Sequence, residues 1–280
     1  MQALLYGQPK WDALSKVGYH WRCDSFNNAS TRTAPTATHT MPSPYDPTKA
    51  LISIHVPKAG GTTVRETMEK WFGNSLYHHY VDESKEVAPN RHPLSSGSCI
   101  HGHFNRFRGY GVDDFYPQAT QFVTFLRDPF EQHVSLFFYL RREAESYRFQ
   151  GKRTPSAMLD SFDGFMAHME AHRDRIQTTF ANTLFAHMPS RFVPLDPYQM
   201  FDNGFVHIGT TDVMTASLAL LGKKLGKPEL MAGAKNASPR DLDISPTLRQ
   251  RHEMIFPEEH AFFRLIQALH ADELRQTGYL

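Results

Sequence analysis

The residues best suited to chemistry lie in the segment Pro-Lys-Ala-Gly-Gly-Thr-Thr at positions 57–63. A short apolar run with β-branched residues precedes it, and a helix-compatible pattern begins at Thr62. A strand, a glycine turn and a helix start together direct several backbone N–H groups at a phosphate. Lys58 adds a compact positive charge, and Thr62 and Thr63 add hydroxyl donors. The segment therefore predicts a phosphate-binding loop.

Two other kinds of loop contain similar residues. A Gly-Gly pair at the end of a strand also occurs in simple tight turns that bind nothing. The Walker A motif of ATPases and GTPases places its lysine after the glycines and directly before Ser or Thr. Here Lys58 precedes Gly60 and Gly61, which argues against an ATPase or a GTPase.

A second candidate anion-binding segment is Phe-Leu-Arg-Asp-Pro-Phe-Glu-Gln-His-Val-Ser at positions 125–135. A strand delivers Arg127 to its carboxyl end, and Asp-Pro then turns the chain into a helix. Ser135 lies about two turns along that helix, so its hydroxyl can share a surface with Arg127. A planar guanidinium and a hydroxyl suit a phosphate monoester. Taken alone, a helix-capping Asp128 beside a surface arginine explains the pattern equally well.

His101 and His103 flank a glycine just after another apolar strand. An alcohol is a poor nucleophile until a base takes its proton, and histidine suits that task near neutral pH. Most of the 16 histidines should be surface or core residues, but the place of this pair beside a predicted anion site favours a catalytic base. No third ligand lies at a suitable spacing, so a zinc site is not expected.

These three segments resemble motifs of the sulfotransferases that use 3′-phosphoadenosine 5′-phosphosulfate (PAPS). Pro-Lys-Ala-Gly-Gly-Thr is similar to their 5′-phosphosulfate loop, usually Pro-Lys-Thr-Gly-Gly-Thr, and only Ala59 departs from it. Arg-Asp-Pro with the downstream Ser135 resembles their 3′-phosphate-binding segment, although the usual second arginine is replaced by Gln132 or His133. His-Gly-His followed by Phe closely resembles the uronyl and hexuronic 2-O-sulfotransferases of glycosaminoglycan synthesis.

The resemblance extends over about residues 51–274 and implies a role for each matching residue. His103 matches the general base, His101 a supporting residue, and Lys58 the cation that stabilises the leaving phosphate. Lys-Asn-Ala-Ser-Pro at 235–239 resembles a later segment that closes over the nucleotide, although a polar surface loop would look the same. The residues assigned to PAPS and its product, 3′-phosphoadenosine 5′-phosphate (PAP), are Lys58, Ala59, Gly60, Gly61, Thr62, Thr63, Arg127, Ser135, Lys235, Asn236 and Ser238. No metal ion is implied.

Strand and helix patterns alternate along most of the chain. We expect strands over residues 51–55, 75–81, 98–101, 121–126 and 205–208. We expect helices over residues 62–72, 129–147, 156–169, 173–187, 212–225 and 257–277. This alternation predicts an α/β fold with a central parallel sheet flanked by helices, and the resemblance implies the P-loop-like sulfotransferase fold. Ligands of such folds bind at the carboxyl ends of the strands, where Lys58 is expected.

Residues 1–50 and 51–280 differ in composition. Residues 24–50 are rich in Ser, Thr, Asn and Pro, so 1–50 is expected to be a poorly structured or loosely packed leader. Residues 51–280 are expected to form one domain. The formal net charge of +1 argues against a general polyanion-binding surface, and no nucleic-acid partner is expected.

Two cysteines, Cys23 and Cys99, are too few for a disulfide framework, although one bridge between them stays open. The sequence shows no signal peptide and no run of about 18 apolar residues. We therefore expect a cytoplasmic protein, and a lumenal domain without its membrane anchor is the alternative.

The expected function is transfer of a sulfuryl group from PAPS to a hydroxyl of a carbohydrate, one candidate being a uronic-acid-containing glycan. A small phenol, a lipid or a protein are the alternative acceptors. A nucleotide kinase is disfavoured by the position of Lys58 and by the lack of an acidic Mg²⁺-binding motif. A non-catalytic relative that binds nucleotide or glycan is disfavoured by the presence of both Lys58 and His103. The sequence does not determine the oligomeric state.

Overall fold

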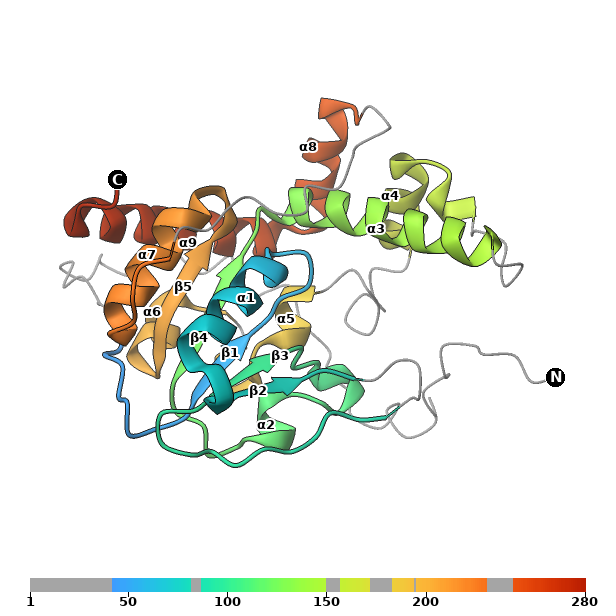
Figure 1. Cartoon of the computed structure of the whole chain (residues 1–280). Coiled ribbons are helices and arrows are strands. Elements are labelled where there is room, and N and C mark those ends of the chain that lie inside the picture. The colour runs from blue at the N-terminus through green and yellow to red at the C-terminus, as the bar shows by residue number, and fades with distance from the viewer. Residues whose placement is uncertain (1–41, 82–86, 150–156, 172–182, 194, 231–243) are drawn as a thin grey trace. The chain divides into compact units, whose positions relative to one another are not determined.

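Five parallel strands form one sheet in the order β2-β3-β1-β4-β5 (Figure 1). The computed structural model describes residues 42–81, 87–149, 157–171, 183–193, 195–230 and 244–280. The strands are β1 Leu51–Ile54, β2 Leu76–His79, β3 Cys99–Gly102, β4 Phe122–Leu126 and β5 Phe205–Thr210. All but β2 are buried throughout, as expected for parallel strands covered on both faces. The predicted α/β class and its five strands are confirmed.

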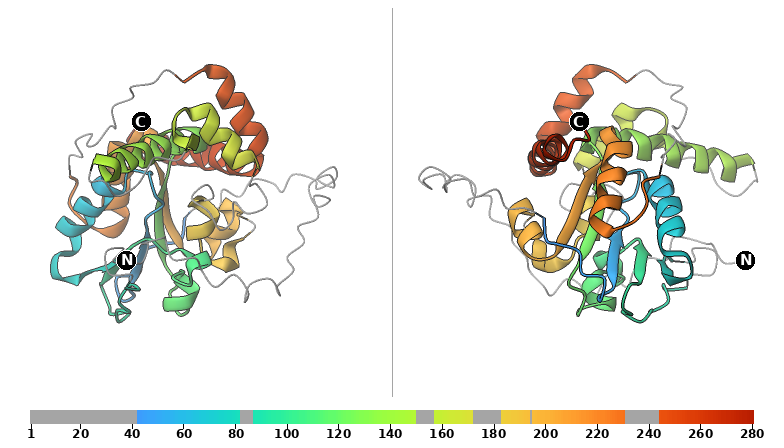
Figure 2. Two further views of the ribbon diagram at one scale, coloured as in Figure 1. Left: turned by 90° about the vertical axis from the view of Figure 1, so that its right-hand side faces the viewer. Right: turned by 60° about the vertical axis from the view of Figure 1, so that its left-hand side comes forward.

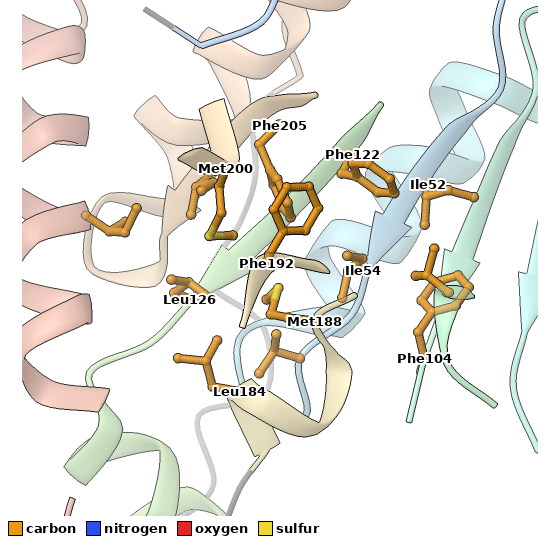
Figure 3. Packing of buried hydrophobic residues seen from close by; sticks show 14 of the residues in the cluster. Ile52, Ile54, Phe104, Phe122, Leu126, Leu184, Met188, Phe192, Met200 and Phe205 are labelled. Carbon is orange, nitrogen blue, oxygen red and sulfur yellow. The ribbon is translucent and has the colours of Figure 1, made fainter. Parts of the chain in front are cut away.

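Helices cover both faces of the sheet (Figure 2). Helices α1 (Gly61–Phe72) and α7 (Met214–Leu225) pack on one face, where their apolar side chains meet Leu51 and Val123. Helices α2 (Val112–Phe115), α5 (Thr183–His187) and α6 (Pro197–Asp202) pack on the other. There Ile52 and Ile54, which alternate with Leu51 along β1, belong to one core cluster with Leu184 and Met200 (Figure 3).

Four further helices gather at the carboxyl end of β4 (Figure 1). They are α3 (Pro129–Phe149), α4 (Phe162–Ala171), α8 (Pro246–Ile255) and α9 (Pro257–Thr277). Side chains of α3, α4 and α8, among them Phe130, Phe162 and Ile255, form a separate core cluster, whereas Phe262 and Phe263 of α9 join the cluster of the sheet. None of the described helices is both long enough and apolar enough to cross a membrane.

The sequence analysis did not predict three helices, α2 (Val112–Phe115), α6 (Pro197–Asp202) and α8 (Pro246–Ile255). Two of them begin with a capping residue that could have been recognised. Asp196 caps α6 by accepting a hydrogen bond from the backbone N–H of Tyr198, and Pro197 follows at the first helical position. Ser245 and Pro246 begin α8 in the same way. The combination of a capping residue and a proline is a helix start signal. The third, α2, is a single turn.

Two predicted helices, α4 and α7, begin later than expected. The helix expected from 156 starts at Phe162, because the hydroxyl of Ser161 accepts a hydrogen bond from the N–H of Gly164 and caps it there. A 3₁₀ turn at Ala157–Leu159 precedes it, and another at Thr211–Val213 precedes α7. Of the helix expected over 173–187, α5 begins at Thr183, and residues 172–182 lie outside the described part.

Most of the expected leader, residues 1–41, lies outside the described residues, as does Cys23. Residues 42–50 are held against the amino-terminal end of β4. The side-chain amide of Gln121 donates to the carbonyls of Asp46 and Lys49, and its oxygen accepts from the N–H of Asp46. Cys99 is buried in β3, and its thiol is free.

A chain of three buried imidazoles joins α3, α8 and α9. His133 Nδ1 lies 2.6 Å from His252 Nε2, and His252 Nδ1 lies 2.8 Å from His260 Nε2. Burial lowers the pKa of His252 and of His260, so these rings are neutral near pH 7. Neutral imidazoles alternate as donor and acceptor along such a chain, which fastens α8 to the start of α3.

Acidification below about pH 6.5, the ordinary histidine pKa, is expected to destabilise the fold. Burial lowers the pKa of His79 to about 4, of His101 to about 3 and of His270 to about 4. Above about pH 6.5 both states are neutral; below it only the unfolded chain takes up these protons, so stability falls as pH falls. Each group then costs about 2 kcal/mol at pH 5, at about 1.36 kcal/mol per pH unit.

Thermal unfolding followed by circular dichroism at pH 7.5 and pH 5.0 checks this expectation. A Tm lower by several degrees at pH 5.0 is predicted. An equal or higher Tm at pH 5.0 would contradict the view that these histidines are neutral in the folded protein.

Candidate functional site

Strand β1 lies between β3 and β4; the chain passes from β1 to β2 on one side of it and from β3 to β4 on the other. Such a switch point leaves a crevice at the carboxyl ends of the strands, where α/β proteins bind their ligands. Strands β1, β3 and β4 end at Ile54, Gly102 and Leu126. The segments that follow them contain Lys58, His103 and Arg127, respectively. The fold thus brings the three predicted segments to one edge of the sheet.

The loop after β1 has the backbone of an anion-binding turn. Lys58 has φ +64° and Gly60 φ +73°, and Lys58 is the one non-glycine residue with positive φ in the described part of the chain. A lysine in this sparsely populated region costs free energy and is typical of functional loops. Helix α1 begins directly at Gly61, and no side chain caps it, so its first N–H groups point into the crevice.

The side chains of the loop divide between the crevice and the core. Thr62 and Thr63, in the first turn of α1, are partly exposed and can add hydroxyl donors. Ala59 is buried in the core cluster beside Ile54, so the crevice can receive only its backbone. The threonine that usually occupies this place would bury its hydroxyl here.

Two side chains of the second segment hold this loop by its carbonyl groups. Gln132 Nε2 donates to the carbonyl of Pro57 at 2.7 Å, and Arg127 Nη1 donates to that of Lys58 at 3.3 Å. Gln132 is at one of the two positions where the 3′-phosphate segment that this chain resembles usually has a second arginine. In this chain it is buried and stabilises the strained loop conformation.

Helix α3 directs one face at Lys58. The ammonium of Lys58 lies 4.5 Å from the ring centroid of Tyr139, within range of a cation–π contact. Gln132 and Tyr139 both reach the loop, and Ser135 lies between them at helical spacing, so Ser135 shares this face. Burial lowers the pKa of Lys58, and the nearby Arg142 and Arg127 lower it further.

Arg127 belongs to a network of charges at the start of α3. Its Nη2 lies 3.7 Å from Glu131 Oε2, and Glu131 Oε1 lies 3.6 Å from Nη2 of Arg249 on α8. Arg249 also pairs with Asp128 at 3.0 Å, while Asp128 Oδ1 accepts from the N–H of Glu131 and caps α3. The helix-capping role considered for Asp128 is therefore present, beside the arginine that is predicted to bind an anion. The sequence did not indicate Arg249.

The two histidines after β3 differ in their surroundings. His101 lies within β3, fully buried, with Nδ1 2.9 Å from Ser53 Oγ, and burial lowers its pKa to about 3. His103 lies just beyond the strand and is partly exposed, and its N–H donates to the carbonyl of His79 at 2.9 Å. Its Nε2 is buried without a hydrogen-bond partner in the described structure. His103 is therefore the more accessible of the two, whereas His101, whose Nε2 also has no partner in the described structure, is enclosed by the sheet.

His103 is neutral and can accept a proton. Burial lowers its pKa well below the ordinary value, and the neighbouring His55 and His187 lower it further. Its ring lies 4.3 Å from that of His55, 5.0 Å from Tyr80 and 5.7 Å from His187, measured between centroids. These three neighbours were not predicted as site residues. His55 precedes the predicted loop by only two residues, so its place at a strand end was the signal that could have found it.

Arginines surround the site. Arg65 and Arg108 lower the pKa values of the histidine group, and Arg127 and Arg142 lower that of Lys58. These arginines bring positive charge to the site although the net charge of the chain is only +1, and Glu131 and Glu69 offset part of it by pairing with Arg127 and Arg65. Such positive charge favours anionic ligands. Lys235, Asn236 and Ser238, the predicted closing segment, lie outside the described residues. Within the described part of the chain, no three His, Cys, Asp or Glu side chains are arranged to hold a metal ion.

Comparison with known proteins assigns residues 44–193 to a family model described as "Sulfotransferase family". Two solved structures are similar in fold. Mouse sulfotransferase SULT7A1 complexed with PAP is 14% identical, with a TM-score of 0.47 over 82% of this chain and 90% of that one. A sulfotransferase from Alicyclobacillus acidocaldarius is 14% identical, with a TM-score of 0.48 over 80% of this chain and 96% of that one. No curated protein sequence matches the chain.

Proposed function

Because this chain belongs to the sulfotransferase family, we propose that it transfers the sulfuryl group of PAPS to a hydroxyl of an acidic carbohydrate, with His103 as the general base. The observation that carries the proposal is the placement of Lys58, His103 and Arg127 just after the carboxyl ends of three adjacent strands, with Arg127 bonded to the carbonyl of Lys58. A uronic-acid-containing glycan is the acceptor that the motifs after β3 favour, and the surrounding arginines support an acidic one.

PAPS carries one phosphate on the 3′ position and one on the 5′ position of its ribose, and a separate part of the site can bind each of them. The N–H groups at the start of α1 and the ammonium of Lys58 can hold the 5′-phosphosulfate. Arg127 and Ser135 can hold the 3′-phosphate, which ATP lacks. The hydrogen bond from Arg127 to the carbonyl of Lys58 links the two parts, so the binding of one end orders the other.

The transfer requires an acceptor oxygen to attack sulfur in line with the departing phosphate. The new bond joins that oxygen to sulfur, and the bond from sulfur to the 5′-phosphate oxygen breaks, which releases PAP. The acceptor proton passes to the neutral imidazole of His103, which later returns it to solvent. Lys58 stabilises the negative charge that grows on the phosphate oxygen as it leaves.

Incubation of the protein with ³⁵S-labelled PAPS and separate acceptors tests this function. The panel contains a desulfated uronate-containing glycan, a neutral glycan, a simple phenol and a tyrosine peptide. We expect label on the uronate-containing glycan. Label on the phenol or the peptide alone would support the sulfotransferase activity and contradict the proposed carbohydrate acceptor. Absence of any transfer, together with Mg²⁺-dependent transfer of phosphate from ATP, would favour a nucleotide kinase instead.

A further inference from the structure

His55 lies between the phosphosulfate loop and His103, and the mechanism above leaves it without a role. It follows β1 directly, and its N–H donates to the carbonyl of Gly102 at 2.8 Å, which ties the end of β1 to that of β3. Its ring lies 4.3 Å from the ring of His103 and stacks in parallel on that of His101 at 5.5 Å, measured between centroids.

The His55 ring also packs against the start of α1. A Cβ atom added to Gly61 would come within 1.6 Å of His55 Nε2 and 2.0 Å of its Cε1. Only glycine therefore allows α1 to begin where it does with this ring in place. His55 thus contacts both the residue whose N–H faces the 5′-phosphosulfate and the residue that accepts the proton.

Tyr80 fixes the orientation of His55. The phenol oxygen lies 3.0 Å from His55 Nδ1, and the Tyr80 ring meets the ring of His103 edge to face at 5.0 Å. Burial raises the pKa of Tyr80, and burial lowers the pKa of His55 well below the ordinary value. Both groups are therefore neutral at physiological pH, and their hydrogen bond persists across that range.

His103 needs such support because its own side chain makes no hydrogen bond within the described structure. Catalytic histidines are commonly oriented by a hydrogen bond from the second ring nitrogen to a carboxylate or a carbonyl group. Around His103 the described residues provide rings instead: His55 on one side, Tyr80 at the edge and His187 across. Of these, His55 is the closest, and it shares a hydrogen bond with Tyr80.

We propose that His55, held by Tyr80, is a positioning residue that fixes the imidazole of His103 beside the phosphosulfate loop. The inference rests on the proposed function, since it assigns His55 a role in that reaction. His55 does not touch the transferred proton. It keeps His103 in the one orientation from which the acceptor hydroxyl and the sulfuryl group are both within reach, and its bulk excludes water from the base.

Three variants separate the hydrogen bond from the ring. His55→Phe keeps an aromatic ring and removes the hydrogen bond, Tyr80→Phe removes the same bond from its other end, and His55→Ala removes the ring. Because misplacement of a reacting group by about 1 Å costs about 100-fold, we expect kcat to fall about 10-fold in the two phenylalanine variants and about 100-fold in His55→Ala. The KM for PAPS should change less than about 2-fold in all three, since the groups proposed to bind PAPS are left in place.

The two phenylalanine changes remove one interaction, so their double variant should be no slower than either alone. His92→Phe serves as the control, because His92 stacks on Tyr77 outside the group around His103. A kcat near that of the wild type in His55→Phe and His55→Ala would overturn the proposal. So would losses that multiply in the double variant, or a rise in the KM for PAPS with kcat unchanged.

A second measurement does not depend on turnover. Burial is the main cause of the low pKa of His103, and removal of the His55 ring admits water beside it. NMR titration of the histidine Cε1–H signals should therefore show the pKa of His103 rising in His55→Ala and staying low in His92→Phe. If the wild-type protein transfers no sulfuryl group, the proposed function fails, and the titration still decides whether His55 shields His103. An unchanged pKa in His55→Ala would overturn that shielding.

Discussion

Replacement of His103 by alanine is expected to lower the rate of sulfuryl transfer about 10²- to 10⁴-fold, the usual contribution of a general base. The expectation follows from the neutral state of His103 and from its partly exposed place at the end of β3. PAP should bind the variant within a few fold of its affinity for the wild type, because Lys58 and Arg127 are untouched. Steady-state kinetics and calorimetric titration with PAP measure the two quantities.

The control for this variant is His168→Ala. His168 is an exposed histidine of α4, and its loss should leave both the rate and the affinity unchanged. A His103→Ala protein that retained a near-normal rate would contradict the assignment of the base. A large loss of PAP affinity with little change in kcat would place His103 in nucleotide binding instead.

Replacement of Arg127 by alanine is expected to weaken PAP about 10- to 100-fold, since a hydrogen bond to a charged group contributes about 1.5–3 kcal/mol. Adenosine 5′-phosphate lacks the 3′-phosphate, so its affinity should fall much less. A small loss is expected for both nucleotides, because Arg127 also donates to the carbonyl of Lys58 and helps to hold the loop. Calorimetric titration with each nucleotide gives the ratio.

Arg251→Ala is the matched control for Arg127→Ala. Arg251 lies on α8 and pairs with Asp163 and Glu170 of α4, so its removal takes away an arginine without touching the crevice. Both nucleotides should bind this variant as they bind the wild type. Equal losses of the two nucleotides in Arg127→Ala would contradict the 3′-phosphate role and leave Arg127 as a support of the loop.

The parts of the site that the sequence revealed are those in which neighbours along the chain act together. The loop at 57–63 joins a strand end, a glycine turn and a helix start, so its geometry follows from local order. Strands β1, β4 and β5 were equally predictable, because buried parallel strands read as short, largely apolar runs. A parallel sheet then brings their carboxyl ends to one edge without further information.

The parts that the sequence did not reveal depend on contacts between distant segments. Tyr80 reaches His55 only because β2 and β1 flank β3 in the same sheet. Arg249 meets Asp128 only because α8 returns to the start of α3, 121 residues away along the chain. Gln132, read as the place of a missing arginine, holds the carbonyl of Pro57. Residue types and their spacing along the chain do not indicate such pairings.

The group of rings around His103 also shows why the histidine count was a poor guide. His79 and His270 are buried in the core and neutral, in line with the expectation that most histidines would be surface or core residues. His55 resembled one more strand residue because it follows an apolar run. Its contact with Gly61 distinguishes it, and that contact becomes visible only once the loop is folded.

A crystal structure of the protein with bound PAP tests the central claim most directly. The account predicts the 5′-phosphate on the N–H groups of Gly61 and Thr62, the 3′-phosphate within hydrogen-bond distance of Arg127 and Ser135, and the imidazole of His103 facing the vacant sulfuryl position. A nucleotide bound with its 3′-phosphate away from Arg127, or with its 5′-phosphate on a side of the sheet that His103 does not face, would contradict it.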